Sequence, residues 1–271
     1  MIYLSETTQK VLDAYLKQPR HGLLLTGSAG VGLATLAHDL ASKVGKHATD
    51  VTLIAPEQST IPIERIRTLY AETRSVHKQP QVIIIDDADT LSLEAQNALL
   101  KLLEEPVENV YFILTTHVLE ELLPTIRSRT QIVEVKRLSQ KQCEHLLDSL
   151  KLTEAKKRSQ ALFLANGLPA ELTRLAEDEG YFADQVRFVE DARAIVQGSL
   201  YDRLRIAANY SDRTAALRLI SVIEHLIRFS VLKQKQLKSI TAVDVLDTVS
   251  KRISANGHTR TQLMYLMTKL P

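Results

Sequence analysis

The segment at residues 81–85 constrains the fold of this chain more than any other. Its residues, Gln-Val-Ile-Ile-Ile, carry no charge and are mostly β-branched, as expected for a strand that is buried on both faces. Such burial requires helices on each side of a sheet, which is typical of parallel α/β folds. Similar runs recur at residues 23–25, 51–54, 110–114 and 131–135. The first half of the chain is therefore predicted to form a parallel α/β domain.

Helical patterns alternate with these strands and then replace them. In the first half, helices are expected at residues 5–17, 33–44, 62–75 and 92–105. After residue 136 the strand signals stop. Further helices are expected at residues 139–150, 154–165 and 169–179, followed by a mostly helical stretch from 184 to 270.

This change in pattern predicts three domains. Residues 1–136 form the α/β domain, residues 137–181 a small helical lid bundle, and residues 182–271 an all-α domain. Gly180-Tyr181-Phe182 is the expected linker between the last two.

The composition is that of an ordinary globular protein and excludes several classes. No apolar run approaches the about 20 residues that span a bilayer, and the first residues lack the pattern of a signal peptide. The single cysteine, Cys143, excludes an internal disulfide and a cysteine-rich zinc module. A cytoplasmic protein without membrane contact or zinc is expected.

The charge is distributed unevenly along the chain. The net charge is only +2, yet residues 186–271 carry 14 lysines and arginines against 7 acidic residues. This basic third can face an acidic partner or phosphates. A scattered, solvated surface explains it equally well.

A glycine loop follows the first predicted strand. Gly27, Gly30 and Gly32 lie between that strand and the next helix, which is the context of a phosphate-binding loop. Backbone amides and a helix N-terminus then face a phosphate. By itself, the pattern also fits a plain glycine-rich turn.

The residues after this loop depart from a working nucleotide site. A working loop continues with lysine, which pairs with the β/γ-phosphates, and then Ser or Thr, which holds Mg²⁺. Here these positions are Leu33 and Ala34, and Thr35 comes one residue too late. The site is therefore expected to be degenerate.

Two acids follow the most apolar strand. Asp86 and Asp87 resemble the end of a Walker B strand, where the first acid holds Mg²⁺ through water and the second, usually Glu, polarises the attacking water. Asp87 is one methylene short for the second role. Carboxylates at such positions also commonly cap helices.

Three further segments resemble those of a known protein family. Residues 97–106, Asn-Ala-Leu-Leu-Lys-Leu-Leu-Glu-Glu-Pro, closely resemble a segment of the clamp-loader AAA+ subunits. Residues 112–116 look like a sensor-1 strand with Thr115 or Thr116 at its tip, and residues 122–130 are similar to the family's Ser-Arg-Cys motif, with Thr in place of Cys. The chain thus resembles clamp-loader subunits of the bacterial DNA polymerase III type, delta-prime subunits among them.

This resemblance implies a subunit of a five-membered assembly that loads a sliding clamp on primed DNA. Arg129, with Ser128 beside it, would act in trans as an arginine finger on ATP held by a neighbour. The chain's own site would comprise Gly27, Gly30, Gly32, Asp86, Asp87 and Thr115, empty or weakly occupied. The implied partners are other clamp-loader subunits, the clamp and DNA phosphates, with no cofactor of its own. The last domain would be the oligomerising collar.

Two departures from the family and three rival functions stay open. The zinc module common in such subunits is absent, and Pro169 stands where a sensor-2 arginine is expected. The rivals are an active P-loop ATPase or kinase, a subunit of the replication factor C or recombination-associated type, and a helical DNA-binding protein. The loss of the loop lysine argues against the first two.

Overall fold

The computed structural model describes residues 2–44, 50–57, 59–73, 80–234 and 240–270. They divide into two compact units, Met1–Glu177 and Asp178–Pro271. The first unit therefore contains the predicted α/β domain and residues 137–177 of the predicted lid, whereas residues 178–181 belong to the second unit.

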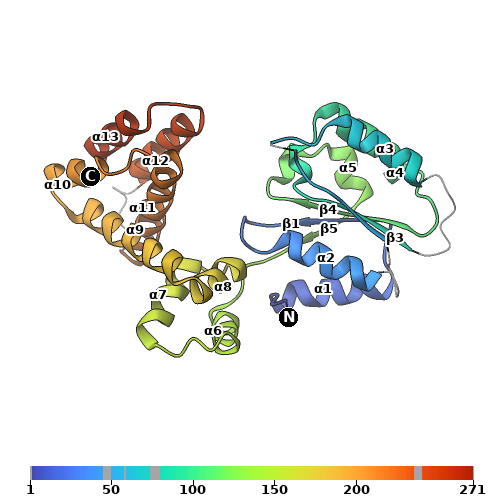
Figure 1. Cartoon of the computed structure of the whole chain (residues 1–271), viewed down its shortest axis with the longest axis horizontal. Helices are drawn as coiled ribbons and strands as arrows, with labels where there is room; N and C mark the ends of the chain where they lie inside the picture. The colour runs from blue at the N-terminus through green and yellow to red at the C-terminus, as the bar shows by residue number, and fades with distance from the viewer. Residues whose placement is uncertain (1, 45–49, 58, 74–79, 235–239, 271) are drawn as a thin grey trace. The chain divides into compact units, whose positions relative to one another are not determined.

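A parallel sheet forms the centre of the first unit (Figure 1). In the described part of the chain its strands run in the order β2-β3-β4-β1-β5, and each neighbouring pair is parallel. The strands are β1 (Gly22–Thr26), β2 (Asp50–Ile54), β3 (Gln81–Ile85), β4 (Val110–Thr116) and β5 (Gln131–Glu134). The predicted parallel α/β fold is confirmed.

Helices cover both faces of this sheet. One face carries α1 (Glu6–Lys17) and α2 (Leu33–Val44), and the other carries α3 (Ile63–Thr73), α4 (Leu93–Glu104) and α5 (Pro124–Arg129). Two short 3₁₀ turns, η1 (Ala88–Thr90) and η2 (Leu119–Glu121), follow β3 and β4.

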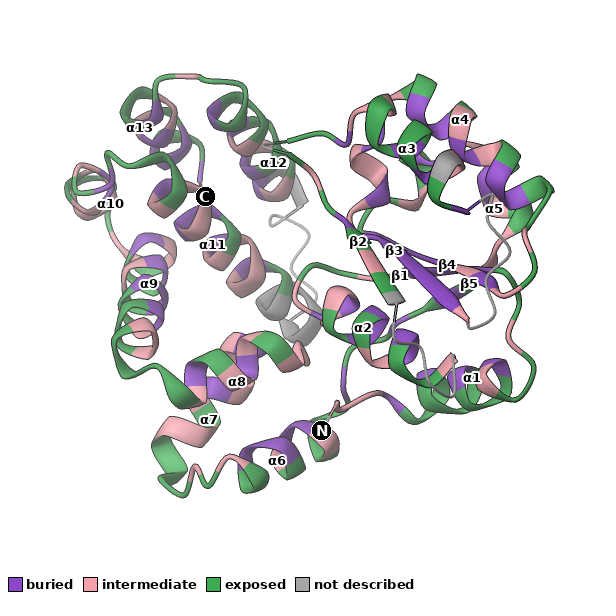
Figure 2. Cartoon of the chain, turned by 45° about the vertical axis from the view of Figure 1, so that its right-hand side comes forward, coloured by how far each residue is buried: buried purple, intermediate pink, exposed green. Residues whose placement is uncertain are grey.

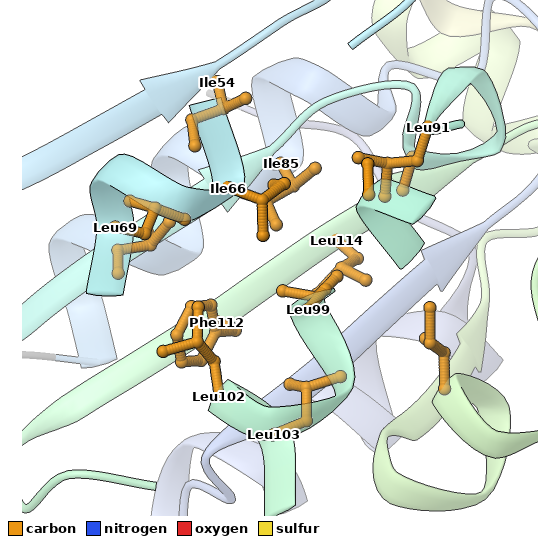
Figure 3. Close-up of a cluster of buried hydrophobic side chains, with 14 of the residues drawn as sticks. Ile54, Ile66, Leu69, Ile85, Leu91, Leu99, Leu102, Leu103, Phe112 and Leu114 are labelled. Atoms are coloured by element: carbon orange, nitrogen blue, oxygen red, sulfur yellow. The ribbon is translucent and has the colours of Figure 1, made fainter. Parts of the chain in front are cut away.

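Strand β3 explains why both faces need cover. Ile83 and Ile85 pack with the cluster under α3 and α4, whereas Val82 and Ile84 pack with the cluster under α1 and α2. Figure 3 shows the first of these clusters, in which Ile85 lies among leucines and isoleucines of the helices and next to β4. Every residue of β3 is buried (Figure 2), so a charge in this strand would lack water and a partner.

Short local signals set the helix ends. The Ser5 hydroxyl accepts a hydrogen bond from the Thr8 amide and caps α1, and Ser92 caps α4 in the same way through Ala95. Pro124 occupies the first turn of α5, where its missing amide hydrogen costs nothing. These caps hold both helices in the register that buries their apolar sides.

The lid helices complete the first unit. They are α6 (Gln140–Ser149), α7 (Ala155–Ala165) and α8 (Pro169–Glu177). A reciprocal capping box of Ser139 and Gln142 starts α6, which satisfies two otherwise unpaired amides.

The second unit is helical in its described part. It comprises α9 (Glu179–Gln197), α10 (Leu200–Ala207), α11 (Arg213–Gln234), α12 (Ile240–Ser254) and α13 (Thr259–Lys269), which share one buried apolar cluster. The expected linker at residues 180–182 is wrong, because α9 already begins at Glu179. The Asp178 side chain accepts a hydrogen bond from the Tyr181 amide and caps this helix, so a single exposed glycine does not interrupt it.

Among the described residues, no helix is both long enough and apolar enough to cross a membrane.

Candidate functional site

The glycine loop joins the carboxyl end of β1 to α2, as predicted. Gly30 and Gly32 have φ values of 86° and 87°, which glycine adopts without the steric cost that other residues meet. The Gly32 carbonyl accepts a hydrogen bond of 2.9 Å from the Leu36 amide. The loop therefore leads directly into the first turn of the helix.

The two residues after the loop bring no charge or hydroxyl to this turn. Leu33 is 3% exposed and packs in one cluster with Leu23 and Leu25 of β1. Ala34 is partly buried, and Thr35 is exposed. The side chains at positions 33 and 34 thus offer neither a positive charge to a phosphate nor an oxygen to a magnesium ion.

Asp86, Asp87 and Thr115 meet at the carboxyl edge of the sheet. The Thr115 hydroxyl donates to Asp86 Oδ1 at 2.6 Å and accepts from the Asp87 amide at 2.9 Å. A hydroxyl has a single proton to donate, and Thr115 is fully buried. In this arrangement Thr115 has no hydrogen left for a nucleotide phosphate.

His117 connects the loop to these acids, although no motif in the sequence points to this residue. Its Nδ1 lies 2.8 Å from the Gly27 carbonyl oxygen, so Nδ1 carries a proton because a carbonyl only accepts. Its Nε2 lies 3.6 Å from Asp87 Oδ1, and its amide donates to Asp89 Oδ1 at 3.3 Å. The partners are distant along the chain, so no local pattern predicts them.

The Asp87 carboxyl is held in an unfavourable setting. Burial raises its pKa above the usual value, the nearby Asp86 charge adds to the rise, and His117 opposes it. Its backbone has a φ of 48°, which is strained for a residue other than glycine. Among the described residues, no group of three or more His, Cys, Asp and Glu side chains could hold a metal ion.

The lid contacts the glycine loop directly. The Ala170 amide of α8 donates to the Gly30 carbonyl at 3.3 Å, and the Leu168 side chain lies against Gly30. A cavity of about 360 Å³ remains beside this contact, lined by Ile2, Tyr3, Val31, Thr35, Pro169 and Thr173 among others. Pro169, at the position expected for a sensor-2 arginine, brings no positive charge to it.

Ser128 and Arg129 lie near the amino end of β1, whereas the glycine loop follows its carboxyl end. The Arg129 carbonyl oxygen would be 3.2 Å from a Cβ placed on Gly22, and Gly22 begins β1 whereas the glycine loop follows its end. The strand between them is about 13 Å long. The structure thus brings together the predicted residues of the nucleotide site and places Ser128 and Arg129 apart from them.

The Arg129 guanidinium is engaged within its own chain. Its Nη2 lies 2.6 Å from Glu104 Oε1, and its Nη1 donates to the Thr125 carbonyl at 3.1 Å and contacts Ser128 Oγ at 3.4 Å. Both Arg129 and Glu104 are partly open to solvent. No pattern in the sequence predicts this ion pair.

Gln96 ties α4 to the segment that carries Arg129. Its buried amide nitrogen donates to the carbonyls of Leu91 and Glu121 at 3.3 and 3.0 Å, and its amide oxygen accepts from the Leu123 amide at 2.8 Å. Leu123 immediately precedes α5. One side chain therefore fixes where that helix begins.

Comparisons with known proteins bear on the family. A family model described as "DNA polymerase III, delta subunit" matches residues 44–139. The replication factor C small subunit of Methanococcus maripaludis is 31% identical over 151 residues, which cover 54% of this chain and 47% of the relative. The DNA polymerase III subunit delta' of Pseudomonas aeruginosa is 30% identical over 139 residues, covering 41% and 42%. The chain thus spans less than half the length of these relatives.

Solved structures agree on the fold. A DNA polymerase III gamma subunit-related protein from Thermotoga maritima has a TM-score of 0.57 and 20% identity, covering 97% of this chain and 98% of that chain. The RuvB Holliday junction branch migration motor of the same organism has a TM-score of 0.54 and 14% identity, covering 96% and 84%. These likenesses identify an AAA+ fold. Together with the matched family model and relatives, they show that this chain is similar to clamp-loader subunits of the AAA+ class.

Proposed function

We propose that this chain is a non-hydrolysing, delta-prime-like clamp-loader subunit that supplies Arg129 in trans to an ATP site of a neighbouring subunit. Its own glycine loop would stay empty or bind nucleotide weakly. The chain would need no cofactor of its own, because the neighbours bind the ATP.

The position of Leu33 carries this proposal. A lysine at this place would carry its ammonium to the β/γ-phosphates, whereas Leu33 is buried in the core. The hydrogen bond from Thr115 to Asp86 and the lid contact at Gly30 point in the same direction. These features support a site that cannot assemble the charges required for hydrolysis.

The finger follows from where Arg129 lies. It lies near the start of β1, whereas the chain's own loop follows the end of that strand, so Arg129 cannot serve that loop and would serve another chain. A guanidinium at the γ-phosphate of a neighbour would stabilise the charge that develops in the transition state. Ser128 would help to orient it, since Ser128 Oγ contacts Nη1.

The partners would be the other subunits of a five-membered clamp loader, a sliding clamp and primed DNA. The names of the relatives, DNA polymerase III subunit delta' and replication factor C small subunit, support this assignment. Contacts to DNA would go to phosphates, which basic side chains bind without reading the bases. The second unit would be the collar that holds the subunits together.

The test is ATP turnover of a reconstituted clamp loader containing this chain or Arg129→Ala. Turnover at the completed site should fall by at least about tenfold, since comparable fingers contribute about 10³ to 10⁵ in GTPases. Arg129→Lys should restore little of it, because lysine lacks the planar fork of donors. Full turnover with Arg129→Ala would contradict the proposal.

The alternative is a nucleotide-binding subunit of the replication factor C or recombination-associated type. The 31% identity to a replication factor C small subunit and the glycine conformations at Gly30 and Gly32 favour it. It predicts saturable ATP binding by the isolated chain.

A further inference from the structure

We propose that Glu104 holds the Arg129 guanidinium in an ion pair on its own chain, a conformation that we call parked. ATP on the neighbouring subunit must then compete with Glu104 for the guanidinium. Glu104 would then be a positioning residue that sets how readily the finger is delivered. This inference rests on the proposed role of Arg129 in trans.

The parked arrangement uses oxygen acceptors of the same chain. Glu104 Oε1 lies 2.6 Å from Nη2, while the Thr125 carbonyl and Ser128 Oγ contact Nη1 at 3.1 and 3.4 Å. Both terminal nitrogens are therefore engaged. These are the donors that bind a phosphate in bidentate fashion, so Arg129 must leave Glu104 to act as a finger.

The place of Glu104 on α4 strengthens its hold. It is the last residue of the helix, where unpaired carbonyls attract a cation in addition to the carboxylate. Gln96, on the same helix, hydrogen-bonds the segment leading into α5. Because one helix anchors both the start of α5 and the guanidinium at its end, the finger is held at two points.

The hold is nevertheless weak enough to release. The Arg129 and Glu104 side chains are 36% and 45% exposed, and ion pairs of such exposure contribute little net free energy. The triphosphate of ATP carries more negative charge than the Glu104 carboxylate and can accept two hydrogen bonds from the guanidinium. The neighbour's ATP can therefore win the guanidinium, whereas an empty neighbour site cannot.

Glu104 also faces an open groove and has a natural control beside it. A groove of about 870 Å³ between α3 and α4 is lined by Glu104, Glu105 and Lys101 among others. Glu105 carries the same charge in the same groove, but the ion pair of Arg129 is made with Glu104. Glu104→Ala and Glu105→Ala thus remove the same charge from neighbouring positions, and only the first removes the contact.

The parking is tested on the isolated full chain by NMR. The Arg129 side-chain N–H signals, assigned by their loss in Arg129→Lys, should exchange with solvent several-fold faster in Glu104→Ala than in the unmodified chain. Glu105→Ala should match the unmodified chain. Equal exchange rates in Glu104→Ala and the unmodified chain would overturn the parking, whatever Arg129 does in the assembly.

The competition is tested by measuring how tightly the neighbouring clamp-loader subunit binds this chain in the presence of ATP. Its ATP-dependent affinity for this chain should rise by about two- to fivefold in Glu104→Ala, the range expected for an exposed ion pair, and stay unchanged in Glu105→Ala. In an Arg129→Ala background, Glu104→Ala should have no effect, because the gain comes through the guanidinium.

The outcomes separate this inference from the proposed function. If Arg129→Ala leaves the neighbour's turnover intact, the finger is refuted while the exchange measurement still decides the parking. If Arg129→Ala abolishes turnover but Glu104→Ala leaves the affinity unchanged or lowers it, the finger stands and the competition is refuted. A gain that persists in the Arg129→Ala background would also refute it, as a general charge effect.

Discussion

Asp87 and His117 face each other at the carboxyl edge of the sheet, with 3.6 Å between Oδ1 and Nε2. Together with the bond from His117 to the Gly27 carbonyl, they occupy the space between the loop and the strand end. This arrangement places a carboxyl group in a partly buried site and a left-handed backbone at Asp87, and both cost free energy. Substitutions at these residues therefore test whether the contacts of this site outweigh that cost.

Asp87→Asn should stabilise the chain at neutral pH. Burial raises the folded-state pKa of this carboxyl above the unfolded value of about 3.9. The native state therefore binds the proton more tightly, and stability falls as pH rises from about 4 through the folded pKa. Asparagine carries no charge and therefore removes that loss.

The measurement is thermal unfolding of both chains between pH 4 and pH 8. Asp87→Asn should raise Tm by on the order of 1–2 °C at pH 7 and leave it nearly unchanged near pH 4. A lower Tm for Asp87→Asn at pH 7 would show that the pairing with His117 outweighs the burial of the charge.

Helices α4 and α5 act as one element because of Gln96. Without this side chain, the Leu91 and Glu121 carbonyls and the Leu123 amide would lose their partners. The first of these bonds is buried and the other two are partly buried, so leaving their backbone groups unpaired is costly. The start of α5, and with it the place of Arg129, depends on a single amide.

Gln96→Ala should lower the free energy of unfolding by about 2–3 kcal/mol, measured by urea denaturation. The neighbouring Asn97→Ala is the control. Asn97 bonds only to the Leu93 carbonyl within its own helix among the contacts described, and its loss should cost less than about 0.5 kcal/mol. Equal costs for the two variants would mean that α5 is held by packing alone.

The sequence predicted the elements whose signal is local and missed those that depend on distant contacts. The uncharged run of β3 and the helical patterns of α1 and α4 sufficed for the sheet and these helices. Helix α5 has only six residues, too few for a periodic pattern. Contacts of His117 and Glu104 join residues far apart along the chain, so neither could be read from spacing.

At the scale of the whole molecule, the chain is two units with separate cores. The first combines the sheet, the glycine loop and the lid, and the second is a helical unit with its own buried cluster. The excess of basic residues lies in the second unit, whereas the glycine loop and Arg129 lie in the first. Under the proposed function, the first unit would complete a neighbour's site and the second would hold the assembly together.

Under the proposed function, this chain cannot use ATP by itself. Calorimetric titration of the isolated full chain with MgATP tests it most directly, with phosphate release followed in the same samples. We predict no saturable binding below about 1 mM, a free energy weaker than about 4 kcal/mol, and no release of phosphate. Micromolar binding accompanied by turnover would contradict the claim and identify the chain as an active nucleotide-binding subunit.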